Sequence, residues 1–324
     1  MTASYTNRAN LPLSLAVWLT HDTYDHDDRA NHISATSLIK PIRQLVLGMR
    51  VPADQQMPDI TDMIASRLGT AIHDAIESAW VTNYTDNLKA LGYPQKVIDR
   101  VVVNPTDEQL TDGAIPVYLE QRSEREIDGF IISGKFDFIA EGRVEDFKST
   151  SVYTYLNKTN DDKYILQGSI YRWLNPEKIT DNEMSINFIF TDWASSRARV
   201  EAKYPDTRVM QYKLPLKSLA ETESYIRQRV ADIKRYLNAP ETSIPECNDE
   251  ELWRKPTVWK WFSKPTNKRA SKNFEDYIEA VTHANMNGGE LRESPGEISA
   301  CKYCDAFTVC TQKDKYIASG ELKL

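Results

Sequence analysis

The chain has 324 residues and a mass of 37.1 kDa, enough for two domains of about 150 residues or for one domain with additions. Its 40 Lys and Arg against 47 Asp and Glu give a net charge of −7, which excludes a uniformly basic nucleic-acid binder but not a local basic patch. No apolar run approaches the about 20 residues of a membrane span, and the first residues lack a secretory pattern. These features predict a cytoplasmic protein.

The first hundred residues are predicted to be helical. Residues 37–47 form one short helix or a pair of turns around Pro41. Residues 60–80 form a clearer helix, because apolar residues recur there at helical spacing: Ile64, Leu68, Ala71, Ile72, Ala75, Ile76 and Trp80. Shorter helices are expected at 86–91 and 95–101.

From residue 115 the apolar period changes to two. Three consecutive strands are predicted at 117–127, 130–139 and 143–148, because Asp128-Gly129 and Glu141-Gly142 are hairpin turn signals. The remaining expected elements are a helix at 163–173, strands at 184–190 and 209–214, a helix at 219–236 and a helix at 274–284. This order predicts a mixed α/β protein.

The hairpin region carries the strongest chemical signal. In a strand at 146–148, Asp146 and Lys148 share one face and Phe147 takes the other, while Asp137 lies on the neighbouring strand across a short turn. Two carboxylates and a lysine suit Mg²⁺ or Mn²⁺ and an activated water. The simpler interpretation is an exposed hairpin with a salt bridge. Asp-x-Lys by itself favours that interpretation, because the tripeptide is common by chance.

Three further motifs stand in order with Asp146-Phe-Lys148. They are Gly69-Thr-Ala-Ile-His73, Gly134-Lys-Phe-Asp137 and Gln167-Gly-Ser-Ile-Tyr171. Together the four resemble the RecB-type branch of the PD-(D/E)XK nuclease superfamily, over residues 73–171. The resemblance implies a restriction-endonuclease-like αβββαβ core, a mixed sheet flanked by helices.

The resemblance also implies roles for the site residues. His73, Asp137, Asp146 and the carbonyl of Phe147 would bind one or two Mg²⁺ or Mn²⁺ ions, and Lys148 would position the attacking water. By itself His73 is more simply an ordinary helix histidine. An acidic residue on the preceding strand lies near the metals in related nucleases, and Glu124 is the expected one, although Glu120 and Glu126 share its parity.

Gln167 and Tyr171 lie four residues apart and share one helix face. Either they position the catalytic hairpin and the DNA backbone, or they pack as an ordinary buried helix does. His21, His26 and His32 lie among Asp22, Asp25, Asp27 and Asp28. These histidines have no helical i, i+4 pairing, so this stretch is predicted to be a solvated acidic segment rather than a metal site.

All four cysteines lie after residue 246, and clustered cysteines in a cytoplasmic chain more often bind metal than form disulfides. Cys301, Cys304 and Cys310 form a Cys-x₂-Cys-x₅-Cys pattern that resembles the C-terminal trio of iron–sulfur nucleases, such as the CRISPR-associated and AddB-type enzymes. In those relatives the fourth cysteine precedes the nuclease core, whereas here the sole remaining candidate is Cys247, which follows it. The resemblance implies a [4Fe–4S] cluster, with Zn²⁺ as the alternative.

Residues 253–272 contain seven Lys or Arg and no acidic residue, interleaved with Trp253, Trp259, Trp261 and Phe262. A solvated loop whose aromatics enter a core is one interpretation. Contact with single-stranded or frayed DNA is favoured, because cations suit phosphates and aromatic rings suit bases.

The sequence therefore predicts a metal-dependent deoxyribonuclease, most simply an exonuclease acting on DNA ends or single-stranded regions. Residues 19–25, 34–41 and 69–73 also resemble phage-encoded exonucleases, which implies a role in phage DNA replication, recombination or degradation in the host cytoplasm. Any helicase or recombination partner is a separate chain, because no P-loop occurs. The alternatives are a catalytically silent DNA-binding or assembly module and a structural zinc protein.

The expected organisation has three segments. Residues 1–110 form a helical region that supplies the histidine-bearing helix, residues 111–240 form the nuclease core, and residues 241–324 form the basic, aromatic and cysteine-rich tail packed on the core.

Overall fold

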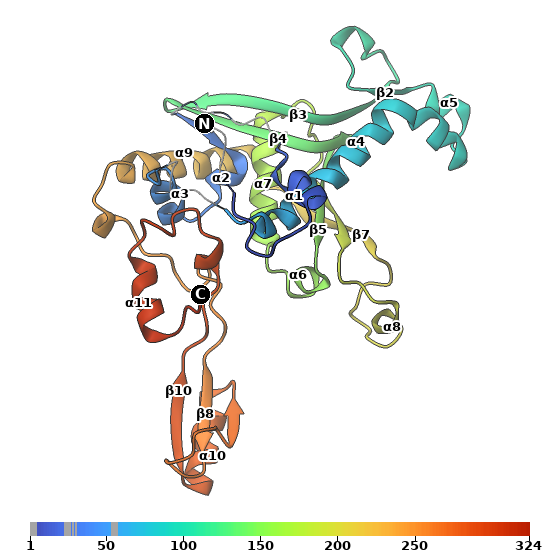
Figure 1. Cartoon of the computed structure of the whole chain (residues 1–324). Helices are drawn as coiled ribbons and strands as arrows, with labels where there is room; N and C mark the ends of the chain where they lie inside the picture. Colours follow the sequence, from blue (N-terminus) through green and yellow to red (C-terminus); the bar gives the residue numbers. More distant parts are fainter. Residues whose placement is uncertain (1–4, 23–26, 28, 30, 53–57) are drawn as a thin grey trace. The chain divides into compact units, whose positions relative to one another are not determined.

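The computed structural model describes residues 5–22, 27, 29, 31–52 and 58–324. The chain divides into two compact units, each built from two stretches of sequence (Figure 1). Unit 1 comprises Met1–Ile39 and Gln56–Ala231, and unit 2 comprises Lys40–Gln55 and Asp232–Leu324. The expected helical region and nuclease core thus fall mainly in unit 1, and the cysteine-rich tail falls in unit 2.

Unit 1 is built on a seven-stranded mixed sheet, which confirms the mixed α/β class. The order is β2-β3-β4-β5-β6-β7, with β1 pairing in parallel with β4 at the side of this path. The bounds are β1 His32–Ser34, β2 Val101–Val103, β3 Ile115–Ile127, β4 Phe130–Ala140, β5 Arg143–Thr150, β6 Glu183–Phe190 and β7 Val209–Pro215.

Two tight hairpins fix the register of β3, β4 and β5. Asp128 and Gly129 both have positive φ, at 50° and 79°, as a two-residue type I′ turn requires. Glu141 and Gly142 repeat this pattern at 51° and 77°. The first turn sets Ile127 opposite Phe130, so position 120 falls opposite position 137. The second turn likewise sets position 137 opposite position 146.

Helix α4 (Ile64–Ala90) is buried along only part of the face that its apolar spacing predicts. Ile64 and Leu68 are 46% and 39% exposed. Trp80, from the same predicted set, has its ring centroid 5.2 Å from that of Phe138 on β4. At Asn83 the backbone leaves helical values (φ −138°, ψ 15°), so the helix is kinked between the two predicted helices at 60–80 and 86–91.

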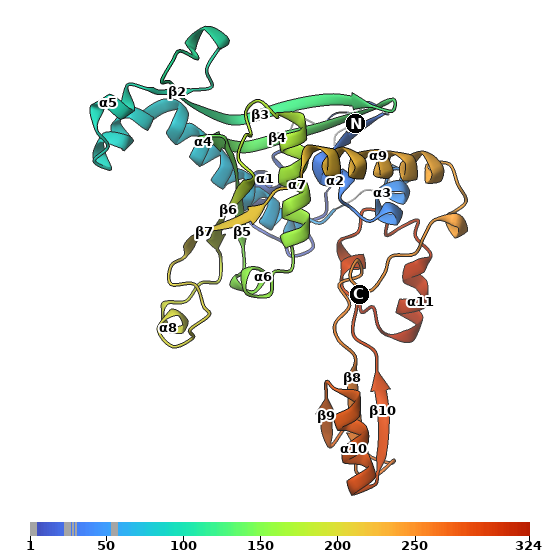
Figure 2. The ribbon, with the colours of Figure 1, turned by 180° about the vertical axis from the view of Figure 1, so that it is seen from behind.

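Helix α7 (Asp161–Leu174) packs against β3, β4, β5 and β6 and carries buried residues along most of its length (Figure 2). Its close approach depends on Gly134 of β4, since a Cβ there would lie 2.8 Å from the Tyr171 ring and 2.9 Å from Leu174. The glycine of the Gly-x-x-Asp motif therefore allows α7 to pack closely on β4.

The other unit 1 elements connect these parts. They are α1 Leu13–Thr20, α2 Ala35–Leu38, η2 Ile60–Met63, α5 Gln95–Ile98, η3 Asp107–Gln109, α6 Val152–Asn157 and α8 Ser195–Ala198. Helix α9 (Leu219–Tyr236) matches the predicted bounds and runs from unit 1 into unit 2.

Unit 2 contains α3 (Ile42–Gly48), η4 (Glu241–Ser243), η5 (Ala300–Tyr303), α11 (Gln312–Ser319) and a second, small sheet. That sheet has the order β10-β8-β9, with β8 Val258–Phe262, β9 Lys272–Phe274 and β10 Glu290–Ser294, and α10 (Tyr277–Asn287) packs against it. Among the helices of the described residues, none combines the length and apolar character needed to cross a membrane.

Candidate metal centre

His73 lies on the sheet-facing side of α4 and joins groups from three strands. Its Nδ1 lies 3.2 Å from Glu120 Oε1 and 3.6 Å from Asp137 Oδ1, and its Nε2 lies 3.2 Å from the carbonyl oxygen of Phe147. Ligand atoms of His73, Glu120 and Asp137 all lie within 4.8 Å of one another. One nitrogen and several oxygens around one point form a donor set that suits a divalent cation.

The acidic residue that β3 contributes to this group is Glu120, whereas the expected Glu124 lies in a second group with Asp27 and His32. Glu120 stands opposite Asp137 in the register, whereas Glu124 pairs with Ser133. At about 3.3 Å per residue, the two glutamates lie roughly 13 Å apart along the strand. The turn at 128–129 places Glu120 opposite Asp137, and the contact with His73 on α4 then brings the Glu120 carboxylate into the group.

A local backbone departure also directs Glu120 to its position. Leu119 belongs to the apolar cluster packed by Trp80 of α4, and yet the next residue, Glu120, also reaches α4 at His73. A straight strand sends consecutive side chains to opposite faces. Glu120 has φ 50°, a left-handed value that is strained for a non-glycine residue, and this change puts two neighbours on one side.

Glu124 instead belongs to a separate group near β1. Arg29 donates to Glu124 Oε1 at 2.6 Å and forms an ion pair with Asp27, and His32 lies 3.5 Å from Asp27. The His32 side chain is 8% exposed and shares a 2.6 Å hydrogen bond with Ser133, so His32 does not lie in a solvated segment as expected. His26, Asp25 and Asp28 lie outside the described residues.

Asp137 is buried and bonded to the neighbouring strand. Its Oδ2 accepts a 2.9 Å hydrogen bond from the backbone N–H of Phe147. Burial, followed by the charge of Asp146, raises the pKa of Asp137 to about 7. A buried carboxyl that shares its surroundings with a second one needs a cation or a proton.

Asp146 points to α7 and is 1% exposed. Its Oδ1 accepts a 3.0 Å hydrogen bond from Gln167 Nε2, and Gln167 also donates to the Tyr171 hydroxyl at 2.9 Å. Its Oδ2 lies 2.6 Å from Lys148 Nζ, although no hydrogen bond of good geometry reaches that oxygen from the described residues. Gln167 thus contacts a site carboxylate directly, and Tyr171 supports Gln167.

The charges of the cluster are strongly interdependent. Burial alone would lower the pKa of His73, but the hydrogen bond with Glu120 and the charge of Asp137 outweigh it and raise that pKa to about 9. Burial would likewise lower the pKa of Lys148, and the charges of Asp146 and Asp137 raise it instead. Lys135 forms a 2.7 Å ion pair with Glu120, and both His73 and Lys135 lower the pKa of Glu120 against the effect of burial.

The protonated His73 therefore stands where a cation would. It donates toward Glu120 from Nδ1 and toward the Phe147 carbonyl from Nε2, so a proton holds together oxygens that are also good ligands for Mg²⁺ or Mn²⁺. Loss of that proton would free a nitrogen lone pair beside two carboxylates. The residues present fit a divalent ion.

In unit 2 the four cysteines are free and half-buried between two apolar clusters. Cys247 and Cys301 pack against one cluster (Leu252, Ile298 and Leu322), and Cys304 and Cys310 pack against the other (Val46, Leu47, Ile244 and Ala306). Burial raises the pKa of Cys247 to about 12 and that of Cys304 to about 11, and the other thiols reinforce both shifts.

Two polar side chains tie the cysteines to the rest of unit 2. Gln312 accepts a 2.9 Å hydrogen bond from the Cys247 N–H and donates a 2.8 Å bond to its carbonyl. Arg43, which is 4% exposed, donates from Nε to Cys310 Sγ at 3.2 Å. A buried guanidinium beside a sulfur suits a negatively charged group at this position.

The basic aromatic segment 253–272 contributes β8 and the start of β9 to the small sheet of unit 2, and its contact with DNA stays a prediction. Trp259 and Trp261 lie on β8 and pack on α10, with ring centroids 4.6 Å from those of Tyr277 and His283. These two rings are partly buried and cover one side of α10. The cations of the segment at 264, 268 and 269 lie in the β8–β9 connection and are exposed.

The sequence matches no family model, and it matches no curated protein. Among solved structures it is similar to that of SSO0001, with 17% identity and a TM-score of 0.41 over 69% of this chain and 85% of that one. It is also similar to an alkaline exonuclease from Laribacter hongkongensis, with 10% identity and a TM-score of 0.36 over 64% and 91%. A phage related exonuclease from Haemophilus somnus 129PT has 16% identity and a TM-score of 0.29 over 64% and 93%. What this chain does is inferred below from its own residues.

Proposed function

We propose that the protein is a metal-dependent deoxyribonuclease that hydrolyses DNA phosphodiesters from ends. The observation that carries the proposal is the convergence of His73, Asp137, Asp146 and the Phe147 carbonyl, with Lys148 beside them. This is the arrangement that the resemblance to RecB-type PD-(D/E)XK nucleases implies. A catalytically silent module would have no need to bury two carboxylates and a lysine together.

One or two Mg²⁺ or Mn²⁺ ions would be held by His73, Asp137, Asp146 and the Phe147 carbonyl, and Glu120 is a further candidate ligand. A divalent ion supplies Lewis-acid activation of water and positive charge for the scissile phosphate. The two aspartates are already oriented by a second group, since the Phe147 N–H donates to Asp137 and Gln167 donates to Asp146. Such support keeps ligand geometry in place before the ion arrives.

Lys148 would act on the reacting groups. Its ammonium is held by Asp146, and 28% of its side chain remains exposed, so it can reach a phosphate oxygen or a water at the opening of the site. Its raised pKa keeps it charged at neutral pH, which suits charge stabilisation in the transition state rather than proton abstraction. The proposed reaction is direct in-line hydrolysis by water.

The cysteines are proposed to hold a [4Fe–4S] cluster that fastens the C-terminal segment within unit 2. A tetrahedral Zn²⁺ site with bonds of about 2.3 Å would bring its sulfurs to roughly 3.8 Å from one another. All four cysteines are described, and no three of their sulfurs lie within 4.8 Å of one another. The wider spacing favours a larger group, and Arg43 would offset its negative charge.

The proposal is tested with end-labelled linear, circular and single-stranded DNA, incubated with Mn²⁺ or Mg²⁺ and with EDTA. Asp137→Asn and Asp146→Asn should lose several orders of magnitude in rate while keeping the fold. Glu124→Gln is the matched control, because it removes a carboxylate of β3 outside the cluster. Full activity of Asp146→Asn, or cleavage in EDTA, would refute the assigned site, and cleavage of circles would replace end-directed action by endonuclease action.

A further inference from the structure

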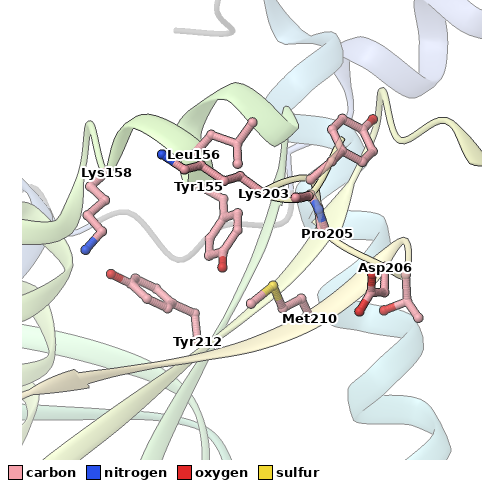
Figure 3. A pocket seen from close by; sticks show the side chains of 11 residues that line it. Tyr155, Leu156, Lys158, Lys203, Pro205, Asp206, Met210 and Tyr212 are labelled. Atoms are coloured by element: carbon pink, nitrogen blue, oxygen red, sulfur yellow. The ribbon is translucent and has the colours of Figure 1, made fainter. Parts of the chain in front are cut away.

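Unit 1 contains a pocket that the proposed chemistry does not use. It has a volume of about 570 Å³ and lies between α6, the connection from β6 to β7, and β7 itself (Figure 3). Tyr155 and Tyr212 line it together with Met210, and two lysines, Lys158 and Lys203, also line it. The volume lies within the range of pockets that bind one small organic group.

The pocket is built into the fold. The Tyr204 hydroxyl accepts a 3.0 Å hydrogen bond from Ala194 N–H, and Trp193 Nε1 donates to the Pro205 carbonyl at 2.8 Å, so the connection between β6 and β7 is braced across itself. At the base of the same connection, Asp192 accepts a 2.7 Å bond from the Val152 N–H at the start of α6. The two walls are therefore held together.

The lining combines aromatic rings with unneutralised positive charge. Tyr155 and Tyr212 meet edge to face at 5.6 Å, and Tyr212 donates to Asp161 at 2.7 Å. Lys158 and Lys203 are exposed, and in the described part of the chain no carboxylate lies within ion-pair distance of either. Asp206 also lines the pocket, so its net charge is positive by one. Ring faces and lysines together suit a base and the phosphates beside it.

The position of the pocket relates it to the catalytic strand. Strand β5 carries Asp146 and Lys148 and continues through Ser151 into α6. Helix α6 starts six residues after Asp146, and at about 3.3 Å per extended residue its start lies roughly 20 Å from Asp146. Lys148 Nζ lies 5.9 Å from the ring of Tyr164, which contacts Phe188, and Phe188 contacts both pocket tyrosines.

We infer that this pocket binds one unpaired nucleotide of the DNA strand that is being cleaved, within about four nucleotides of the scissile phosphate. The base would lie against the Tyr155 and Tyr212 side, and Lys158 and Lys203 would contact the flanking phosphates. This inference rests on the proposed function, and it gives the enzyme a means of holding a frayed or single-stranded end in register. A nucleotide inside a duplex could not reach such a pocket without leaving its stack.

Ala202→Trp tests the inference without disturbing the core, because Ala202 is an exposed pocket residue whose enlargement fills the space. Val200→Trp is the matched control, since Val200 is 80% exposed in the same connection and does not line the pocket. Binding of single-stranded oligonucleotides is measured by fluorescence anisotropy in EDTA, with one abasic site moved along the strand. Cleavage of the same oligonucleotides by the wild-type protein in Mn²⁺ gives the distance of each abasic position from the scissile bond.

Wild type and Val200→Trp should show one abasic position that weakens binding about tenfold, and Ala202→Trp should lose this position-specific effect. The double change Lys158→Ala and Lys203→Ala should lower the salt slope by about 1.4, at about 0.7 per single-strand phosphate contact. A flat abasic profile in a protein that cleaves DNA would overturn the pocket inference alone. If free deoxynucleoside monophosphate competes with the oligonucleotide but no abasic position weakens binding, the pocket inference is also overturned, and the pocket is then a site for the released product. Absence of any DNA cleavage by wild type would instead overturn the proposed function.

Discussion

Replacement of Lys148 by Met should destabilise metal-free unit 1 at pH 8. Lys148 Nζ lies 2.6 Å from Asp146 Oδ2, and Asp146 is 1% exposed, so the change leaves a buried carboxylate without its cation. Breaking a buried ion pair from one side costs about 3–5 kcal/mol. Because 28% of the Lys148 side chain is exposed and water can partly replace it, we expect the lower end, about 3 kcal/mol.

The loss should depend on pH in a defined direction. Burial and the charge of Asp146 raise the pKa of Asp137 to about 7, and the charge of Lys148 opposes that rise. Without Lys148, Asp137 therefore binds its proton still more tightly in the folded state than in the unfolded state. A group whose folded pKa is raised contributes stability that is lost as pH rises through that pKa. The deficit of Lys148→Met should therefore be largest at pH 8 and shrink toward pH 5.

Hydrogen exchange of peptides covering residues 130–150, in EDTA, reports the opening free energy of unit 1 without interference from unit 2. The double variant Lys148→Met and Asp146→Asn is the control, because it removes the uncompensated charge along with the lysine. It should recover most of the loss, and Mn²⁺ should stabilise the single variant. Equal protection of wild type and Lys148→Met at pH 8, or equal loss in the double variant, would refute the reasoning.

Four further outcomes are expected. Mn²⁺ affinity measured by calorimetry should rise about tenfold per pH unit from pH 7 toward 9 and then level off. The reason is that His73, whose pKa is raised from 6.5 to about 9, must lose a proton before it can bind the ion. An affinity independent of pH would contradict this. Gly134→Ala should lower stability by about 1–3 kcal/mol in thermal unfolding, since its Cβ would lie 2.8 Å from the Tyr171 ring; unchanged unfolding would contradict this packing argument. Cys247→Ser should give a pale protein that is cleaved by protease after about residue 245, and full iron and sulfide content in this variant would exclude Cys247 as a ligand. Gln312→Ala should weaken iron retention, because it removes both hydrogen bonds to the Cys247 backbone.

Local patterns were sufficient for most of unit 1. The alternation of apolar residues and the two turn dipeptides predicted β3, β4 and β5 almost to the residue, and the predicted α9 has its observed bounds. Those turns also set the register, because a two-residue type I′ hairpin leaves a single pairing open to the flanking strands. Short pieces such as β1, β2 and α6 were missed, since three to six residues carry too little periodicity to be recognised.

The small sheet of unit 2 shows the opposite case. Its strands interleave cations and tryptophans, a pattern that fits either a DNA-binding surface or aromatics that enter a core. The structure brings Trp259 against Tyr277 and Trp261 against His283 on α10. An aromatic ring has the same sequence signature whether it covers a helix or binds a base, so only the packing partner distinguishes the two.

At the candidate metal centre, the sequence by itself determined which residue types stand on β4 and β5, and thereby placed Asp137, Asp146 and Lys148 on neighbouring strands. Tertiary structure decided which glutamate joins them. Glu120 and Glu124 have equal parity and similar neighbours, and the difference arises from the contact of β3 with His73 on α4 and from the left-handed backbone at Glu120. A backbone departure of this kind is stable only when surrounding contacts hold it, and those contacts come from residues 47 positions away in the chain, which no local pattern can report.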